Sequence, residues 1–342
     1  MPFLHKKPTT YEVLKSHGVD RRTFLDFCTR TTALMGLAPA MVPSVVKALV
    51  TQPRVPVIWL HGLECTCCSE SLLRASHPIV SDIILNLISL DYDDTLQVAA
   101  GFQAEEIRQT IMKQYAGQYL LAVEGNAPTK NGGVQCIVGG KTFLSVLEES
   151  ASRARAVIAW GSCATSGCIQ AATPNPTGVL PVSALIRNKP VINVPGCPPI
   201  ADVMAGVIAY VVTQGKLPEL DSQGRPKMYY SKTVHEECER KDNFEEGRFV
   251  QNWGDDGARK GWCLFKMGCR GPITHNRCSE MKWNGGTSWP VDAGHPCIGC
   301  AEKGFWDNGP LYQQVEGLRA SGREHDEHDE HDERELVHAG ER

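Results

Sequence analysis

The 342-residue sequence lacks features that would place it in several simple classes of protein. It has no run of about 18 or more apolar residues, so it predicts no transmembrane helix, which needs about 20 of them. It has no strong basic excess, because its formal net charge is −4, so nothing indicates a nucleic-acid partner. Disulfide bonds are not required for folding, since a chain of this length can bury a sizeable core.

Cysteine, by contrast, is abundant, with 14 residues in the chain. Several have the short spacings of metal ligands, as Cys297 and Cys300 do. Metal binding is therefore favoured for the clustered thiols, and disulfide bonds remain the alternative for any thiol outside a cluster. The segment CTCC is unusual, because Cys67 stands between Cys65 and Cys68, where an ordinary metal site needs only a pair.

The first 48 residues have the features of an export signal. Paired arginines precede phenylalanine and leucine in DRRTFLDF at 20–27, and a short apolar stretch interrupted by proline follows at 31–46. This pattern resembles a twin-arginine signal, which exports folded proteins. We therefore expect residues 1–48 to be a signal peptide, cleaved after Ala48, and the mature protein to lie on the periplasmic side of the cytoplasmic membrane. The alternative is a disordered arm with a chance arginine pair.

The chain ends in an acidic, histidine-rich segment at 318–342, which contains the repeat HDEHDEHDE. Its composition predicts a disordered, solvated tail. The alternative is weak capture of Ni²⁺ or Zn²⁺ by His325, His328 and His331.

Between these ends, apolar segments alternate with helical patterns. The predicted strands are 54–62, 119–126, 154–163 and 189–197. The predicted helices include 69–90 and 141–154. This alternation predicts an α/β fold with a parallel sheet and right-handed crossovers.

Three cysteines follow directly after predicted strands: Cys65, Cys163 and Cys197. Because ligands bind in the crevice at the carboxyl ends of parallel strands, these distant thiols should converge on one site. Nearby glycines, such as Gly161, let the backbone turn closely around a bulky cofactor.

Beyond about residue 220 the sequence has few apolar runs and many turn residues, as in a loop-rich domain held together by inorganic cofactors. One ligand set there is His235, Cys238, Cys263 and Cys269. A second set is Cys278, Cys297 and Cys300. Zinc could occupy either set. Iron–sulfur clusters are favoured, because three thiols suit a three-iron cluster and the sheet end has more thiols than one zinc accepts.

Eight motifs together resemble the small subunit of a nickel–iron hydrogenase. They are HGLECTCCSES, LDYDDTL, AVEGN, WGSCA, VPGCPPI, GRPKMYY, KMGC and HPCIGC, and they span roughly residues 54–310. The resemblance implies a flavodoxin-like domain at 49–220 and an iron–sulfur domain at 221–317. It also implies a large-subunit partner that holds the nickel–iron site, so this chain would relay electrons and hold no catalytic residue.

The resemblance also assigns ligands. The four standard ligands of the proximal cluster correspond to Cys65, Cys68, Cys163 and Cys197. The distal [4Fe–4S] cluster corresponds to His235, Cys238, Cys263 and Cys269. The medial [3Fe–4S] cluster corresponds to Cys278, Cys297 and Cys300, with Pro290 where a fourth thiol would complete a cubane.

Standard members have glycine at the positions of Cys67 and Cys168. The oxygen-tolerant, membrane-bound uptake subgroup has cysteine at both, and there six thiolates hold a proximal [4Fe–3S] cluster. The resemblance therefore implies this cluster here. It also places Glu64 and Glu124 beside the cluster, although each could equally be an ordinary polar loop residue.

The sequence departs from that subgroup at its end, because the usual anchoring helix that docks on a cytochrome b is not seen. The electron acceptor and any assembly beyond a heterodimer are therefore open. Two other classes compete with the hydrogenase interpretation. One is a quinone-reductase subunit of respiratory complex I, which resembles only the N-terminal half; the other is a zinc-stabilised binding protein.

Four further residues have ordinary structural interpretations. Cys28 would be lost with the signal, and Cys136 is expected to be a small buried residue. His61 and His77 are expected to be satisfied groups near the cluster loop or in the core rather than ligands.

Overall fold

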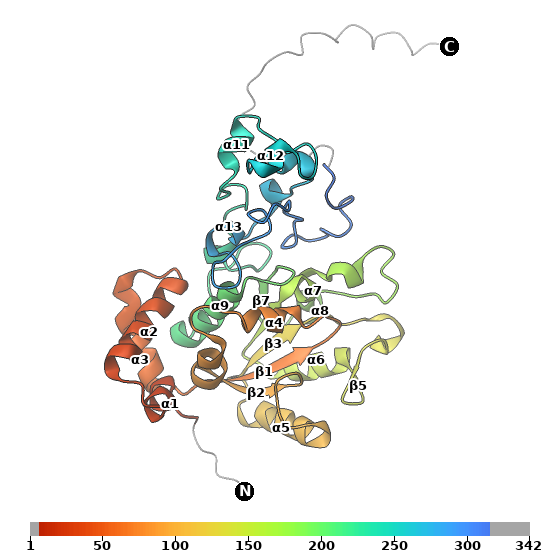
Figure 1. Cartoon of the computed structure of the whole chain (residues 1–342). Helices are drawn as coiled ribbons and strands as arrows, with labels where there is room; N and C mark the ends of the chain where they lie inside the picture. The colour runs from red at the N-terminus through yellow and green to blue at the C-terminus, as the bar shows by residue number, and fades with distance from the viewer. Residues whose placement is uncertain (1–6, 315–342) are drawn as a thin grey trace, which may run out of the picture.

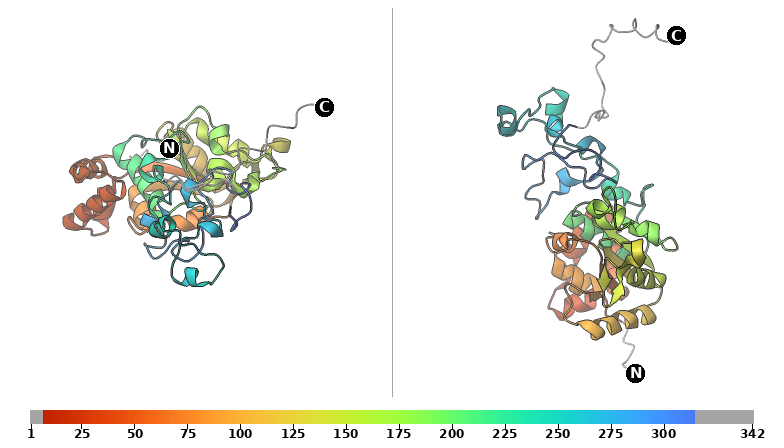
Figure 2. Two further views of the ribbon diagram at one scale, coloured as in Figure 1. Left: turned by 90° about the horizontal axis from the view of Figure 1, so that it is seen from above. Right: turned by 90° about the vertical axis from the view of Figure 1, so that its right-hand side faces the viewer.

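The computed structural model of the protein describes residues 7–314 (Figure 1). The predicted tail at 318–342 lies outside the described residues. The described chain has three parts: a group of N-terminal helices, an α/β part built on a sheet, and a loop-rich part that stands at one end of the α/β part (Figure 2). Within residues 7–314, no helix is long and apolar enough to cross a membrane.

The centre of the α/β part is a five-stranded parallel sheet. Its strands in chain order are β1 (Val55–His61), β2 (Ile88–Asp93), β3 (Leu120–Glu124), β6 (Ala156–Trp160) and β7 (Val191–Val194). Their spatial order is β2-β1-β3-β6-β7, with every neighbouring pair parallel. Counted along the chain this is the 2-1-3-4-5 order of flavodoxin-like folds. The predicted α/β fold with a parallel sheet is therefore confirmed.

The four predicted strands are β1, β3, β6 and β7, but the long helix predicted at 69–90 is wrong. The chain there forms α4 (Cys67–Leu72), a turn, a short π-helix η2 (Asp82–Leu87) and the edge strand β2. Pro78 lacks the backbone N–H that a continuous helix needs. Ile88 pairs with Val55 of β1, and this long-range pairing overrides the local helical pattern.

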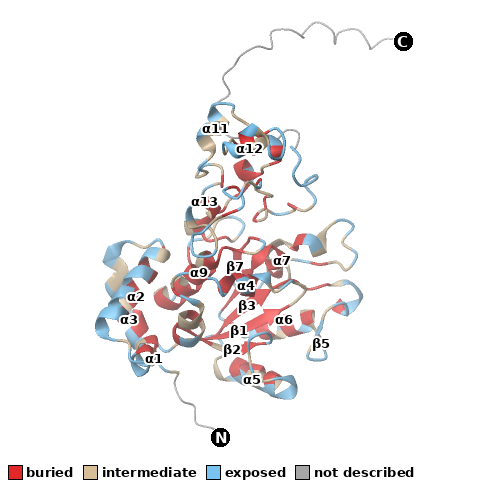
Figure 3. Cartoon of the chain, viewed as in Figure 1, coloured by how far each residue is buried: buried red, intermediate tan, exposed pale blue. Residues whose placement is uncertain are grey.

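Alternate residues of each strand face opposite sides of the sheet, and each side has its own hydrophobic core. Val57 and Trp59 of β1 belong to the core that includes α9 (Ala201–Gln214). Ile58 and Leu60 belong to the core that includes α5 (Gly101–Gln114) and α6 (Phe143–Ser152). Because helices cover both faces, the strands are buried almost throughout, as Figure 3 shows.

Shorter elements complete the two larger parts. The α/β part also contains η3 (Lys130–Gly133), β4 (Ile137–Val138), β5 (Lys141–Thr142), α7 (Gly161–Ser166), η4 (Cys168–Ala171) and α8 (Val182–Leu185). The loop-rich part contains α10 (Lys227–Tyr230), α11 (Lys241–Glu245), α12 (Asp256–Arg259), η5 (Phe265–Met267), η6 (Gly271–Ile273) and α13 (Cys278–Met281). Each of these six helices spans five residues or fewer, so regular backbone pairing contributes little to the stability of the loop-rich part.

Residues 7–51 form a helical unit that we call the N-terminal cap. It comprises α1 (Thr10–Ser16), α2 (Arg21–Leu34), η1 (Pro39–Met41) and α3 (Val42–Thr51). Thr9 and Glu12 form a capping box at the start of α1, and Asp20 accepts a hydrogen bond from the Thr23 amide at the start of α2. The cap is thus helical rather than disordered, and it packs beside α9 (Figure 1).

Candidate iron–sulfur sites

The carboxyl edge of the sheet carries the six thiols that the family resemblance assigned to one site. They are Cys65, Cys67 and Cys68 after β1, Cys163 and Cys168 after β6, and Cys197 after β7. Three of them are buried and three are exposed. The site is therefore open on one side in the isolated chain.

Cys168 connects two of the loops. Its thiol lies within hydrogen-bonding reach of the sulfurs of Cys163 and Cys197. This interaction lowers the pKa of Cys197 to about 7, and it also lowers the pKa of Cys163, while that of Cys168 rises. Cys163 Sγ also accepts a hydrogen bond from Gln170 Nε2 at 3.5 Å. Sulfurs this close favour thiolate at some positions, which is the form that binds iron.

Gly161, directly after β6, brings the backbone close to Cys68, with no side chain between them. Gly161 has a φ of +78°, and a Cβ built on it would overlap Cys68 Sγ. Glycine is therefore required there both for backbone conformation and for space. The Ser162 amide donates to the Gly196 carbonyl at 2.8 Å, which ties the β6 loop to the β7 loop.

Glu124, at the end of β3, holds the cysteine loop in place. Its carboxylate accepts hydrogen bonds from the amides of Cys68 at 2.9 Å and Ser69 at 3.0 Å, and from the Ser69 hydroxyl at 2.6 Å. The carboxylate thereby satisfies two free amides in the first turn of α4. Glu64 is half-buried and accepts a hydrogen bond from Thr66 Oγ1 at 3.3 Å.

His61, at the end of β1, lies between two pairs of carboxylates. Nδ1 is 3.6 Å from Glu64 and 3.8 Å from Glu124, and Nε2 is 3.5 Å from Asp93 and 3.8 Å from Asp94. Burial alone would lower the pKa of His61, but the nearby carboxylates of Asp93 and Glu64 outweigh it and raise the pKa to about 10. His61 is therefore an imidazolium that balances buried negative charge beside the thiols, a role that strand-end patterns in the sequence did not show.

We expect His61→Gln to lower the melting temperature of the assembled protein by about 6 °C or more, because removing one partner of a buried charge pair costs about 3–5 kcal/mol. The contribution of His61 to the free energy of unfolding is full below about pH 6.5, which is the pKa of histidine in the unfolded chain. This contribution is lost progressively as the pH rises to about 10, the pKa in the folded protein. The difference in melting temperature between the variant and wild type should therefore become smaller across that pH range. The variants are compared in the full-length, unprocessed protein, in which exposed His17→Gln is the control, and an equal loss in both variants would contradict the charge-balance role.

The second thiol set lies in the loop-rich part, next to the first. Cys278 begins α13, and burial raises the pKa of its thiol, as it does for Cys297 (to about 12) and Cys300 (to about 11). The Ser162 hydroxyl donates to the Cys300 carbonyl, and the Cys197 amide lies near enough to the Cys300 thiol to offset part of the rise in its pKa. The two sets are therefore in contact through hydrogen bonds.

Pro290 lies in the same loop-rich part. It is exposed, and its carbonyl accepts a hydrogen bond from the His295 amide at 2.8 Å. Its assignment as the residue that replaces a fourth thiol stays a prediction.

The third set surrounds a cavity of its own. His235, Cys238, Cys263 and Cys269 all line this cavity. Burial lowers the pKa of His235, which keeps the imidazole neutral and able to bind metal. The amide of Arg270, directly after Cys269, donates to the Cys297 carbonyl at 2.7 Å, so this set adjoins the second set.

The spacing of these thiols bears on the choice between zinc and iron. Zinc–sulfur bonds of about 2.3 Å place the ligand atoms of a tetrahedral site about 3.8 Å apart. Among residues 7–314, the groups of three potential ligands whose atoms all lie within 4.8 Å of one another centre on His61 and contain no cysteine. Among the described residues, no three ligands of the cysteine sets are therefore as close together as those of a single zinc ion.

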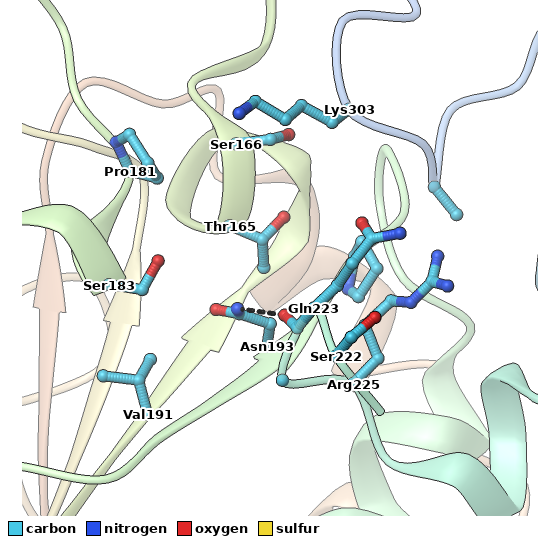
Figure 4. A pocket seen from close by; sticks show the side chains of 13 residues that line it. Thr165, Ser166, Pro181, Ser183, Val191, Asn193, Ser222, Gln223, Arg225 and Lys303 are labelled. Carbon is cyan, nitrogen blue, oxygen red and sulfur yellow. Dashed lines mark hydrogen bonds between the residues drawn. The ribbon is translucent and has the colours of Figure 1, made fainter. Parts of the chain in front are cut away.

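A polar pocket of about 410 Å³ lies beside these sets, at the seam between the two larger parts (Figure 4). Thr165, Ser183 and Asn193 line it from the α/β part, and Lys303 lies at its edge. Of the residues that the structure describes, no cysteine, histidine, aspartate or glutamate lines this pocket. It therefore offers no metal ligand set and no carboxylate or imidazole for acid–base chemistry.

Two other predicted side chains are placed as follows. Cys136 is half-buried and packs against the core that includes α5 and α6, so it is less buried than expected. His77 is half-buried and contacts the N-terminal cap, with its ring edge-on to Phe27.

Comparison with known proteins decides the family. A family model that describes the C-terminal domain of the NiFe/NiFeSe hydrogenase small subunit matches residues 230–313. The uptake hydrogenase small subunit of Azotobacter vinelandii is 55% identical over 316 residues, which are 92% of this chain and 88% of that protein. The chain belongs to the nickel–iron hydrogenase small-subunit family. The hydrogenase-1 small chain of Escherichia coli K12 is 51% identical over 319 residues, or 93% of this chain and 86% of that one.

Solved hydrogenase structures agree with this membership. A chain of the [NiFeSe] hydrogenase from Desulfovibrio vulgaris Hildenborough is 34% identical, with a TM-score of 0.72, and the match covers 77% of this chain and 99% of that one. A chain of the actinobacterial-type NiFe hydrogenase from Ralstonia eutropha H16 is 28% identical, with a TM-score of 0.70, over 77% of this chain and 83% of that one.

The family also accounts for the competing quinone-reductase interpretation. A model described as the NADH ubiquinone oxidoreductase 20 kDa subunit matches residues 65–211, which lie in the α/β part and end within α9. The hydrogenase small-subunit model matches the loop-rich part instead. The match to the quinone-reductase subunit therefore covers only the α/β part of this chain. The hydrogenase interpretation accounts for both the α/β part and the loop-rich part.

Proposed function

We propose that this chain is the electron-transfer subunit of an uptake hydrogenase. It would carry electrons from hydrogen, oxidised at a nickel–iron site in a large-subunit partner, to an external acceptor. The observation that carries the proposal is the contact between three ligand sets in series. Cys300 adjoins Cys197 of the first set, and Cys297 adjoins Cys269 of the third.

The order of the three sets along the molecule supports a relay. The first set lies at the sheet edge, beside α4 and α7, and the second includes the start of α13 (Figure 1). The third set flanks α11 and α12, which lie farthest from the sheet (Figure 1). Electrons entering at the sheet would therefore leave at the far end of the loop-rich part.

The exposed side of the first set supports a partner subunit there. Cys65, Cys67 and Cys197 are exposed in this chain, and a cluster bound by them would face solvent unless another protein covered it. A large subunit seated on this edge would bring its nickel–iron site next to the first electron carrier.

The residues fit three iron–sulfur clusters, which supply one-electron redox chemistry when bound. We assign the six thiols at the sheet edge to a [4Fe–3S] cluster. We assign Cys278, Cys297 and Cys300 to a [3Fe–4S] cluster, and the set with His235 to a [4Fe–4S] cluster. The six-thiol set is the reason that we also propose oxygen tolerance.

We further propose export by the twin-arginine route to the periplasmic side of the cytoplasmic membrane, with cleavage after Ala48. Arg21 and Arg22 are exposed at the start of α2, where an export receptor can reach them. The acceptor would be a cytochrome b or another redox protein that docks near the third set.

Co-purification from the native host, followed by metal analysis, tests the proposal. We expect a large subunit that contains nickel, and about eleven irons in the clusters of this chain. Zinc without iron, and no absorption near 400 nm, would overturn it.

If the third set is the electron exit, His235→Ala should slow hydrogen-dependent reduction of an external dye by at least about ten-fold, since it disturbs the outermost carrier. Hydrogen-isotope exchange should persist, because that reaction moves no electron out of the protein. His235→Cys, which keeps a ligand at this position, should retain the cluster and serves as control. Loss of exchange in a fully loaded His235→Ala protein would contradict the assignment.

A further inference from the structure

The N-terminal cap is docked on the rest of the described chain, residues 52–314, through a buried apolar interface. We call this remaining part the body. Cys28 and Val45 are fully buried, and Met35 is 1% exposed. Phe27 packs edge-on against the ring of His77, with ring centroids 5.6 Å apart. Phe27, Cys28, Met35 and Val45 belong to one hydrophobic core with α9 and one face of the sheet, so the cap is part of that core.

The helix beneath the cap explains why docking is favourable. Eleven of the fourteen residues of α9 are buried, so this helix is apolar on nearly all sides. A helix of this kind must be covered all round. The sheet covers one side, and α2 and α3 of the cap cover another. Without the cap, part of this apolar surface would face water.

Polar contacts fix the cap in one position. Lys7 Nζ lies 2.7 Å from Asp91 Oδ1 of β2, in an ion pair whose side chains are about 15% exposed. At the other end of the interface, the hydroxyl of Tyr229 donates to the carbonyl of Leu34, the last residue of α2, at 2.8 Å. Asp91 and Tyr229 belong to the body, so each contact can be removed without changing the cap.

The expected processing site lies within this interface. Ala48 and Leu49 are inside α3 and are 6% and 2% exposed. A protease binds its substrate in an extended form, so the bond between them can be cut only after α3 has left α9 and unwound. Arg21 and Arg22, in contrast, are exposed while the cap is docked.

We propose that the docked cap is an autoinhibitory contact: it protects the Ala48–Leu49 bond and covers the apolar side of α9, while the arginine pair stays accessible. Processing would then wait until the cap is pulled away from the folded body. This inference rests on the proposed export only in naming that bond as the processing site.

Limited proteolysis of the full-length, cluster-loaded complex with its large subunit tests the proposal. Thermolysin cuts before leucine, so mass spectrometry can follow the new N-terminus at Leu49. We expect Asp91→Asn combined with Tyr229→Phe to speed this cleavage by about ten-fold or more, because the ion pair of Lys7 and the hydrogen bond to the Leu34 carbonyl are both lost. Asp242→Asn combined with Tyr312→Phe changes the same residue types outside the cap interface, and should match wild type.

Iron content and hydrogen oxidation should be unchanged in both double variants, which confirms that the body is folded. Cleavage of wild type as fast as a free peptide of residues 40–56 would overturn the proposal, and so would equal rates in the two double variants. The export hypothesis fails separately: if the protein from cells begins before Leu49, export with cleavage there is wrong, although slow cleavage in vitro still supports docking.

Discussion

Gly161→Ala should leave the protein unable to hold the cluster that we propose at the sheet edge. The new methyl group would lie closer to Cys68 Sγ than van der Waals contact allows, and Gly161 has a φ of +78° that disfavours a side chain. Cys68 cannot retreat easily, because Glu124 holds its amide and the residue is only 8% exposed. We therefore expect about four fewer irons per chain and loss of hydrogen-dependent dye reduction, measured by iron analysis and activity assay.

Gly247→Ala is the matched control. Gly247 has a φ of +71°, and a Cβ there would meet no atom within 4 Å. It therefore carries the same backbone penalty, about 1 kcal/mol, without the clash. Full iron content and activity in Gly161→Ala would show that the approach of Gly161 to Cys68 is not needed for the cluster, whereas equal losses in both variants would assign the effect to the backbone alone.

The strands of the sheet could be predicted because each is a short, buried, apolar run with turn residues beside it. The edge strand β2 was missed, since its residues follow directly on a helical pattern and are set apart only by pairing with β1. Such pairing joins Ile88 to Val55 across more than thirty residues, which no local pattern can show. The docked position of the N-terminal cap was missed for the same reason, because it depends on α9.

The candidate ligand positions could be predicted from the sequence because thiols at strand ends and at metal spacings have few other uses. Their surroundings were not. Glu124 lies 56 residues from the Cys68 amide that it holds, and His61 is matched with Asp93 and Asp94 only when β1 and β2 are neighbours. Charge balance of this kind depends on three-dimensional placement.

Replacing both Cys67 and Cys168 with glycine should preserve hydrogen oxidation without oxygen and abolish it under oxygen. The backbone itself accepts this change. Cys168 has a φ of +50°, in the left-handed region that favours glycine, so the native cysteine costs about 1 kcal/mol there. A residue held in such a conformation indicates a function that outweighs the strain. Glycine should relieve that strain, and the four remaining thiols can hold an ordinary four-iron cluster.

The loss under oxygen follows from electron supply. Oxygen that reaches a nickel–iron site must be reduced fully to water, and this needs several electrons returned quickly through the relay. Two additional thiolates add negative charge around the iron and lower its successive potentials, so a six-thiolate cluster can give up one electron more than a four-thiolate cluster. In this proposal Cys168 is one of the two additional ligands, and its sulfur lies within hydrogen-bonding reach of Cys163 and Cys197.

Electrochemistry of the immobilised heterodimer, with oxygen pulsed into the cell, measures the effect. Wild type should recover its current after each pulse, while the double glycine variant should not. Cys136→Gly removes a half-buried thiol that belongs to none of the three sets, and it should behave as wild type. If the double variant recovers as fully as wild type, the two additional thiols have no part in oxygen tolerance. If it also loses anaerobic current while keeping its iron, they are needed for electron transfer itself.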